Sequence, residues 1–467
     1  MSYYSSRPFL LFTISLAILL VAPILFRDGM FMDTVQYAAV SKNMAMGNGS
    51  FWNSQFDLYN IHNLPAFYEQ PPLGIYLLSI FYKIFGNSML VERIYTFLLF
   101  IIGGFLIVKL WKHIFKTRNN EISNLYWIPL LLWVTTPIIF HNYQNNFLEN
   151  LLTVFCLTSI LFLFKSIKQH FWLYTIISAF AVFLAVLTKG LPGLFPIITP
   201  LLYAATGHLN WRKALLQFAL VIATVAVLFF TLLQYKPAAV FFDNYLFGRA
   251  FERIKTEVVQ GNRFFIIKSL LFELLIPIVL VLISLIFKRV LKLKFKFIDI
   301  AFLFLLIGMS ASFPIALTRI QKPFYLSPSI PFYAIGFGII IIPIITFILN
   351  KFTPRIWIIN SLSIVLLIAA IVSYVLMKDI PVRNKEMIYD LKIISGVVPD
   401  NTIISCSTLE YYNWSLHANL IRKYSINLDF NSSNKYYLRD KNSVISIDTN
   451  YQIINLKTKQ FDIYLIK

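Results

Sequence analysis

The sequence predicts an all-α polytopic membrane domain followed by a small soluble α/β domain. Three observations support this fold class. The chain has 467 residues, of which 58% are hydrophobic and only 13% are charged, and one soluble core cannot bury that much apolar surface. Apolar stretches of about 20 residues, the length that crosses a bilayer as a helix, recur from residue 8 to residue 377. Polar residues interrupt the chain more often after that point.

These stretches predict about 11 transmembrane helices, within a range of 11–13, and the long stretch 324–350 has room for paired helices. That stretch contains Pro328, Pro331 and Pro343. The stretch 71–85 is apolar but short and carries Lys83, so we expect an interfacial helix there. The predicted spans are residues 8–26, 94–111, 123–141, 147–164, 171–188, 190–206, 214–235, 264–287, 297–317, 324–348 and 356–377.

The net charge of +20 lies mostly in short loops between the apolar stretches, where basic residues set topology rather than bind nucleic acid. If residues 1–7 are cytoplasmic, the basic loops 109–118, 165–170, 212–213, 288–296 and 351–355 all face the cytoplasm. The loop 27–93, here called the first loop, and the domain 378–467 then lie outside. We therefore expect a transmembrane domain 1–377 in a bacterial inner (plasma) membrane, with the C-terminal domain 378–467 outside the cytoplasm.

Several basic residues remain on the outer side, against the bias that places the others. A phosphate-bearing ligand at the membrane surface would explain them, and interfacial residues that snorkel to water would be the other explanation. They are Arg249, Arg253, Lys255, Arg263, Arg319 and Lys322.

The C-terminal domain shows no catalytic constellation, so a role in binding, docking or stability is expected. Its pattern predicts helices at 384–395 and 409–423. Strands are predicted at 402–406, 444–447, 452–456 and 463–466.

Five short motifs follow one another on the predicted outer side. They are MDTVQYAA from residue 32, FYEQPPL from residue 67, FLEN from residue 147, LTKGLPG from residue 187 and QKPFY from residue 321, with Arg93 at the start of the second span. In this order they resemble the GT-C superfamily of membrane glycosyltransferases, most closely the branch of the protein O-mannosyltransferases and the lipid A aminoarabinose transferase. The resemblance covers about residues 8–340.

The resemblance implies an inverting glycosyltransferase that moves a sugar from a polyprenyl-phosphate donor to a hydroxyl acceptor on a lipid, glycan or protein. That chemistry needs a base and fixed positive charge around the leaving phosphate. Asp33 matches the family's catalytic aspartate and is the predicted base; the alternative is an N-cap of a helix beginning at Thr34. Glu149 stands where the family usually has aspartate, and its burial at a span requires a wet cavity or a cation. The alternative for Glu149 is a charge that complements the helix dipole.

The predicted phosphate-binding residues are Lys322, Arg249, Arg253 and Lys189, with Tyr325 as a hydrogen-bond donor or, alternatively, an aromatic-belt residue. Glu69 matches a divalent-metal position of the aminoarabinose transferase. The histidine expected in the loop 236–263 is absent, so the metal remains open. His62 is a stand-in ligand or a residue without a role.

A transporter or flippase of a lipid-linked sugar is the alternative function, and a non-catalytic scaffold is the third. A transporter would be expected to have charged residues near the middle of the membrane and broken helices at corresponding positions of two repeated halves. The predicted acids lie at the ends of spans, and no repeat is found. The sequence therefore favours a transferase whose partners are a polyprenyl-linked sugar, an unidentified hydroxyl acceptor and membrane lipid, with no nucleic acid.

Overall fold

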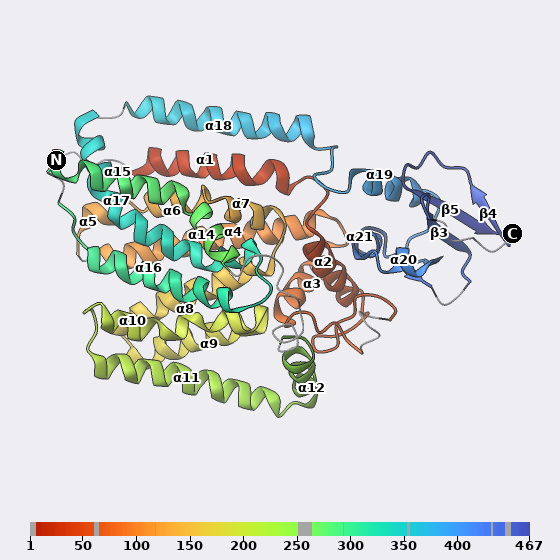
Figure 1. The fold of residues 1–467 in the computed structure, drawn as a ribbon, viewed down its shortest axis with the longest axis horizontal. Helices are drawn as coiled ribbons and strands as arrows, with labels where there is room; N and C mark the ends of the chain where they lie inside the picture. Colours follow the sequence, from red (N-terminus) through yellow and green to blue (C-terminus); the bar gives the residue numbers. More distant parts are fainter. Residues whose placement is uncertain are drawn as a thin grey trace. The chain divides into compact units, whose positions relative to one another are not determined.

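The computed structural model describes residues 6–59, 65–116, 118–250, 264–292, 294–352, 355–430, 433–443 and 450–467. These residues form two compact units, drawn together in Figure 1. The spanning unit comprises Met1–Pro23, Phe97–Gln144 and Leu148–Ser373, and the loop-tail unit comprises Ile24–Thr96, Asn145–Phe147 and Tyr374–Lys467. The predicted division after residue 377 places the first loop with the spans, whereas the compact units place it with the C-terminal domain.

In the described residues, eight helices are long and apolar enough to cross a membrane, or up to ten if each of two bent pairs counts as one span. Those of the spanning unit pack through small and apolar side chains. Leu163, Ala179, Val182 and Val221 form one such core, and the hydroxyls of Ser159 and Ser178 lie 2.8 Å apart between α8 (Leu148–Lys168) and α9 (Phe171–Lys189). The eight are α1 (Ser6–Leu25), α4 (Leu90–Phe115), α8 (Leu148–Lys168), α9 (Phe171–Lys189), α11 (Trp211–Leu233), α16 (Ile298–Ser312) with η4 (Phe313–Leu317), η5 (Pro323–Ser329) with α17 (Ile330–Phe352), and α18 (Ile356–Met377).

The two bent pairs correspond to the predicted spans 123–141 and 264–287. One bends by 73° between α6 (Trp127–Val134) and α7 (Pro137–Gln144), after the short α5 (Asn120–Ser123). The other bends by 63° between α14 (Phe265–Glu273) and α15 (Leu275–Val290). Proline has no N–H to continue the helix, and Pro137 and Pro277 lie just after the two breaks. The predicted spans 123–141 and 264–287 therefore correspond to bent helix pairs and not to single continuous helices.

The predicted span 190–206 is also irregular. It forms a 3-10 segment, η2 (Leu191–Ile198), and then the short helix α10 (Thr199–Ala205), which together are too short to count as a span. Pro192 and Pro196 remove backbone donors from η2. Another segment of this unit is α12 (Lys236–Tyr245), which leads into the π-type turn η3 (Leu246–Ala250).

The loop-tail unit begins with α2 (Met32–Ala45) and α3 (Leu73–Phe85). The helix predicted at 71–85 is confirmed as a short apolar helix, and its interfacial position stays a prediction. The C-terminal part contains α19 (Lys385–Ile394), α20 (Thr408–Tyr411) and α21 (Trp414–Tyr424) beside a mixed sheet of five described strands in the order β2-β1-β3-β5-β4. These are β1 (Ile403–Cys406), β2 (Asn427–Asp429), β3 (Tyr436–Asp440), β4 (Tyr451–Ile454) and β5 (Phe461–Ile466).

The predicted α/β tail is confirmed, with corrections in detail. The single helix predicted at 409–423 is two helices, because Ser407 and Glu410 form a capping box that starts α20 and Asn413 caps α21. Strands β2 and β3 were not predicted; both pair in parallel with β1. The strand predicted at 444–447 lies outside the described residues.

The first loop packs into the core of this tail. Tyr59 contacts the buried cluster around Leu420 and Phe461, and its hydroxyl donates to Asp429 at 2.9 Å. Asp57 accepts a hydrogen bond of 3.1 Å from the hydroxyl of Tyr411. The first loop and the C-terminal domain are therefore one packed body within this unit.

Candidate functional site

Two of the predicted site residues form a buried ion pair in the spanning unit. Glu149 lies in the first turn of α8 and Lys189 in the last turn of α9, and Lys189 Nζ is 3.1 Å from Glu149 Oε1. The side chains are only 1% and 8% exposed. Each charge also complements the dipole of its own helix end. The cation required by the burial of Glu149 is therefore present, and it is Lys189.

The local chain conformation fixes Lys189 at this helix end. Gly190 terminates α9 with φ +75, a left-handed conformation that favours glycine. A Cβ atom on Gly190 would overlap the side chain of Tyr245 from α12. The Tyr245 hydroxyl also lies 3.5 Å from the carbonyl oxygen of Lys189. The glycine in the LTKGLPG motif therefore serves the geometry of the lysine before it.

Tyr325 joins this pair. Lys189 Nζ lies 5.7 Å from the centre of the Tyr325 ring, a cation–π distance. Tyr325 and Lys322 belong to the same turn, since Lys322 occupies the N-cap position of η5 and its carbonyl oxygen accepts from Tyr325 N at 3.1 Å. Both side chains are half-buried. The spanning unit thus brings together Glu149, Lys189 and Tyr325, here called the buried-pair cluster, with Lys322 in the same turn as Tyr325.

Two asparagines that the sequence analysis missed fix η5 against the start of α8. Asn142 Nδ2 donates to the carbonyl oxygen of Phe324 at 3.1 Å, and Asn150 Nδ2 donates to the carbonyl oxygen of Asn142 at 3.1 Å. Both side chains are fully buried. The position of Asn150 inside the predicted span 147–164 was the available signal, because buried polar groups need partners.

Glu273 is a further buried acid missed by the sequence analysis, and it lies inside the predicted span 264–287. It is 7% exposed, and its Oε2 accepts a hydrogen bond of 2.7 Å from Ile138 N. That N–H is in the first turn of α7, where no helical partner exists. Glu273 therefore caps α7 and ties the two bent helix pairs together.

The side chains of the two remaining predicted phosphate ligands are not described by the structure. The side chain of Arg249, and Arg253 as a whole, lie outside the described residues, as does His62. Their assignments stay predictions.

Asp33 lies in the loop-tail unit, in the first turn of α2, where it is half-buried. The N-cap alternative for Asp33 is wrong, because α2 begins at Met32 and the cap position is Phe31, which offers no side-chain cap. A carboxylate in the first turn is stabilised by the helix dipole. Its assignment as the base stays a prediction.

The start of α2 is held from two other segments of its unit. Asn145 Oδ1 accepts from Phe31 N at 2.8 Å and from Arg383 Nη1 at 3.1 Å. Gly29 has φ +89, and a Cβ there would overlap the main-chain nitrogen of Arg383. The backbone before Asp33 is thus fixed by close main-chain packing that only glycine permits.

Glu69 is half-buried in the first loop. Across the described part of the chain, no group of three or more His, Cys, Asp or Glu side chains is placed to hold a metal ion. These residues do not supply a ligand set around Glu69, so we derive no step through a metal, and Glu69 as a ligand stays a prediction.

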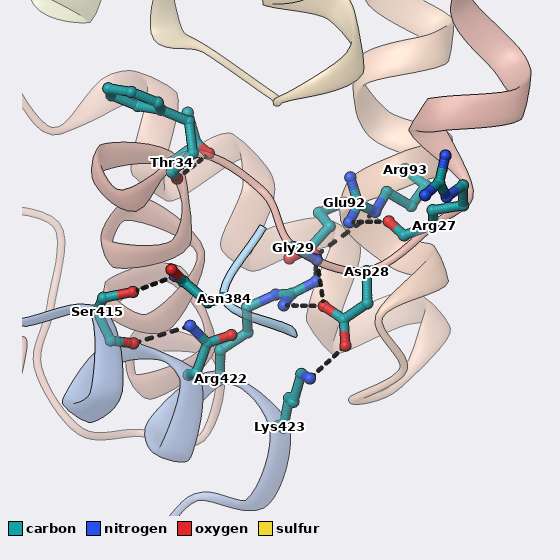
Figure 2. A network of polar contacts seen from close by, with 12 residues as sticks. Arg27, Asp28, Gly29, Thr34, Glu92, Arg93, Asn384, Ser415, Arg422 and Lys423 are labelled. Atoms are coloured by element: carbon teal, nitrogen blue, oxygen red, sulfur yellow. Dashed lines mark hydrogen bonds and ion pairs between the residues drawn. The ribbon is translucent and has the colours of Figure 1, made fainter. Parts of the chain in front are cut away.

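A buried network of charges in the loop-tail unit was not foreseen (Figure 2). Arg422 of α21 forms ion pairs with Glu92 and Asp28, and Lys423 pairs with Asp28. The Tyr82 hydroxyl donates to Glu92 Oε2 at 2.6 Å. Burial alone would raise the pKa of Asp28, but the charges of Arg422 and Lys423 outweigh it and lower that pKa to about 2. Asp28 is therefore ionised throughout the physiological pH range.

The fold can now be compared with those of known proteins. Residues 69–235 match the family model of dolichyl-phosphate-mannose-protein mannosyltransferases. The chain is similar to that family over this segment, which is less than half of its length.

Solved structures share the fold over nearly the whole chain. The crystal structure of ArnT from Cupriavidus metallidurans bound to undecaprenyl phosphate matches this chain with a TM-score of 0.68 at 12% identity. The match covers 97% of each of the two chains. Its apo structure has a TM-score of 0.67 at 12% identity, again with 97% of each chain. The apo oligosaccharyltransferase of Archaeoglobus fulgidus has a TM-score of 0.53 and 12% identity over 94% of this chain and 70% of that one. No curated protein matches the chain in sequence.

Proposed function

We propose that this protein transfers a sugar from a polyprenyl-phosphate donor to a hydroxyl acceptor on a lipid, glycan or protein, with inversion at the anomeric carbon. The observation that carries the proposal is the buried Glu149–Lys189 pair beside Tyr325. Buried ionisable residues in a membrane domain are costly and typically mark a substrate or ion site. The match to a transferase family and the undecaprenyl phosphate bound by ArnT support a lipid phosphate as that anion.

The reaction is a single displacement. The acceptor oxygen attacks the anomeric carbon while the bond from that carbon to the phosphate oxygen breaks, so the configuration inverts. Asp33 accepts the proton of the hydroxyl. The polyprenyl phosphate leaves with the electron pair, and Lys189 and Lys322 stabilise its growing negative charge, together with Tyr325, Arg249 and Arg253. Glu149 orients the ammonium of Lys189.

Transport of a lipid-linked sugar is the second candidate function, favoured by the two bent helix pairs. Both bends have local causes, since prolines follow the breaks and Glu273 accepts a hydrogen bond from the N–H of α7 that has no helical partner. Because of these local causes, the bends support a transporter less strongly than the buried pair supports a transferase.

A transfer assay decides between these functions. The purified protein is incubated with a panel of labelled polyprenyl-phosphate sugars and candidate hydroxyl acceptors. We expect acceptor-dependent consumption of one donor and appearance of free polyprenyl phosphate. Movement of labelled donor across a liposome bilayer without any consumption would instead establish a transporter.

The proposed orientation places the first loop and the C-terminal domain outside the cytoplasm of a bacterial inner membrane. Cysteines are introduced at the exposed positions Lys292 and Lys457, one variant each, in a chain whose native Cys156 and Cys406 are buried. In intact cells an impermeant thiol reagent should label position 457 and leave position 292 unlabelled, since the basic loop stays inside. The reverse pattern would show that the orientation is inverted.

Lys322→Ala is expected to lower turnover by about 10²-fold while donor affinity falls less, because a fixed charge acts most on the charge that develops in the transition state. Lys322→Arg keeps the charge and alters its geometry, so an intermediate rate is expected. Initial rates and donor binding are measured on both variants. The control is Lys83→Ala, an exposed lysine of α3. Wild-type turnover in Lys322→Ala would remove this residue from the site.

A further inference from the structure

Helix α21 of the C-terminal domain holds the first loop and the start of α4 through buried charges (Figure 2). Arg422 is 1% exposed; its Nη2 donates to Glu92 Oε1, and its Nη1 lies 3.6 Å from Asp28 Oδ1. The main-chain oxygen of the same residue accepts a hydrogen bond of 3.1 Å from Lys42 Nζ on α2. Residue 422 therefore binds the loop before α2, α2 itself and the start of α4.

The acidic partners of this residue are held on their other sides too. Glu92 is fully buried and accepts from Tyr82. Asp28 Oδ1 accepts from Gly29 N at 2.7 Å, and its Oδ2 pairs with Lys423. Removing one member of such a network leaves an uncompensated buried charge, so the network holds one geometry or breaks.

This geometry extends along the chain to Asp33. Asp28 is fixed by its side chain and by its carbonyl oxygen, which accepts from Val382 N at 2.8 Å. Phe31, three residues later, donates its N–H to Asn145. The next turn is the start of α2, which carries Asp33. The position of Asp33 is therefore set by contacts that include a buried charge of the C-terminal domain, that of Arg422.

A packed apolar contact would attach the domain at least as firmly, because buried ion pairs contribute little net stability compared with apolar replacements. What directional ion pairs add is a defined geometry. A defined geometry is of use where an angstrom of displacement changes the rate.

We propose that Arg422 is a positioning residue for Asp33, so that the C-terminal domain is part of the catalytic unit and not an appended binding module. The inference rests on the proposed function, since it takes Asp33 as the base.

The test compares Arg422→Met and Arg422→Lys with the matched control Arg439→Met. Arg439 lies in the same domain on β3 and donates at 2.6 Å to the carbonyl oxygen of Ser443, a contact within the C-terminal domain. Three quantities are measured on each variant: hydrogen exchange of peptides covering residues 27–33 and 461–466, the kcat and donor KM of sugar transfer, and the pH profile of kcat.

For Arg422→Met we expect exchange in 27–33 to rise about 10-fold or more while 461–466 keeps its protection. The kcat should fall about 10- to 100-fold with donor KM changed by less than about 3-fold, since a displaced base affects the transition state more than donor binding. The acidic limb of the kcat profile should shift, because the surroundings of Asp33 change. Arg422→Lys should retain part of the rate, and Arg439→Met should resemble the wild type.

If Arg422→Met does not fold, Arg422→Lys carries the same comparison. Unchanged exchange in 27–33 would overturn the inference. So would a rate that falls only with the folded fraction and keeps the wild-type pH profile, as a purely structural anchor predicts. If the wild type transfers no sugar from any donor while the exchange result holds, the proposed function fails and the coupling of α21 to the start of α2 stands.

Discussion

Replacing Asp33 by asparagine is expected to lower turnover by about 10²-fold or more while the protein remains folded and inserted. The asparagine side chain would keep the size and polarity of the aspartate but could not accept the proton of an attacking hydroxyl. The helix should persist, because Phe31 and not Asp33 occupies the N-cap position of α2. Turnover with one defined donor, donor binding and thermal stability are measured together.

The matched control is Asp379→Asn, an exposed aspartate just beyond α18. It removes the same charge from the same unit and should leave turnover unchanged. In Asp33→Asn the pH profile of any residual rate should no longer show the acidic limb. Near-wild-type turnover in this variant would end the mechanism proposed above.

Replacing Lys189 by methionine is expected to abolish most turnover and to destabilise the spanning unit. Glu149 is 1% exposed and would lose the ammonium 3.1 Å away. Removal of one partner of a buried ion pair typically costs about 3–5 kcal/mol. Protonation of Glu149 would limit that cost. Thermal unfolding in detergent and the rate of sugar transfer report the two effects.

A second substitution separates stability from chemistry. In the double variant Glu149→Gln, Lys189→Met neither charge of this pair is left buried, so the melting temperature should recover towards the wild type. Turnover should stay at least about 10²-fold lower, because the cation proposed to stabilise the leaving phosphate is still absent. Lys168→Met, at the exposed C-terminal end of α8, is the control. Recovery of turnover together with stability would show that the pair is only structural.

The membrane-spanning character, the basic loops and the α/β tail are readable from the sequence because each depends on local composition. A helix that crosses a bilayer needs about 20 apolar residues in a row, wherever its neighbours lie. The requirement that Glu149 meet either a wet cavity or a cation was predictable for a similar reason, since a lone carboxylate in an apolar span is costly. The motif LTKGLPG already contained Lys189, which pairs with Glu149, and Gly190, which ends α9.

The breaks between α6 and α7 and between α14 and α15 depended on more than composition. Pro137 and Pro277 were visible, but a proline in an apolar stretch produces either a kink or a break, according to what satisfies the freed backbone groups. Glu273 satisfies Ile138 N from another helix. The short strands β2 and β3 likewise owe their existence to pairing with β1.

Local sequence thus determined which segments are apolar enough to enter a membrane and which side chains needed partners, because those properties follow from the free energy of burying each residue. The tertiary structure alone decided the partners of Arg422. That residue is 330 positions from Glu92 in the chain, and no local pattern relates them. The charge network exists because folding brings α21 against the loop before Asp33, where low exposure makes each charge depend on the others.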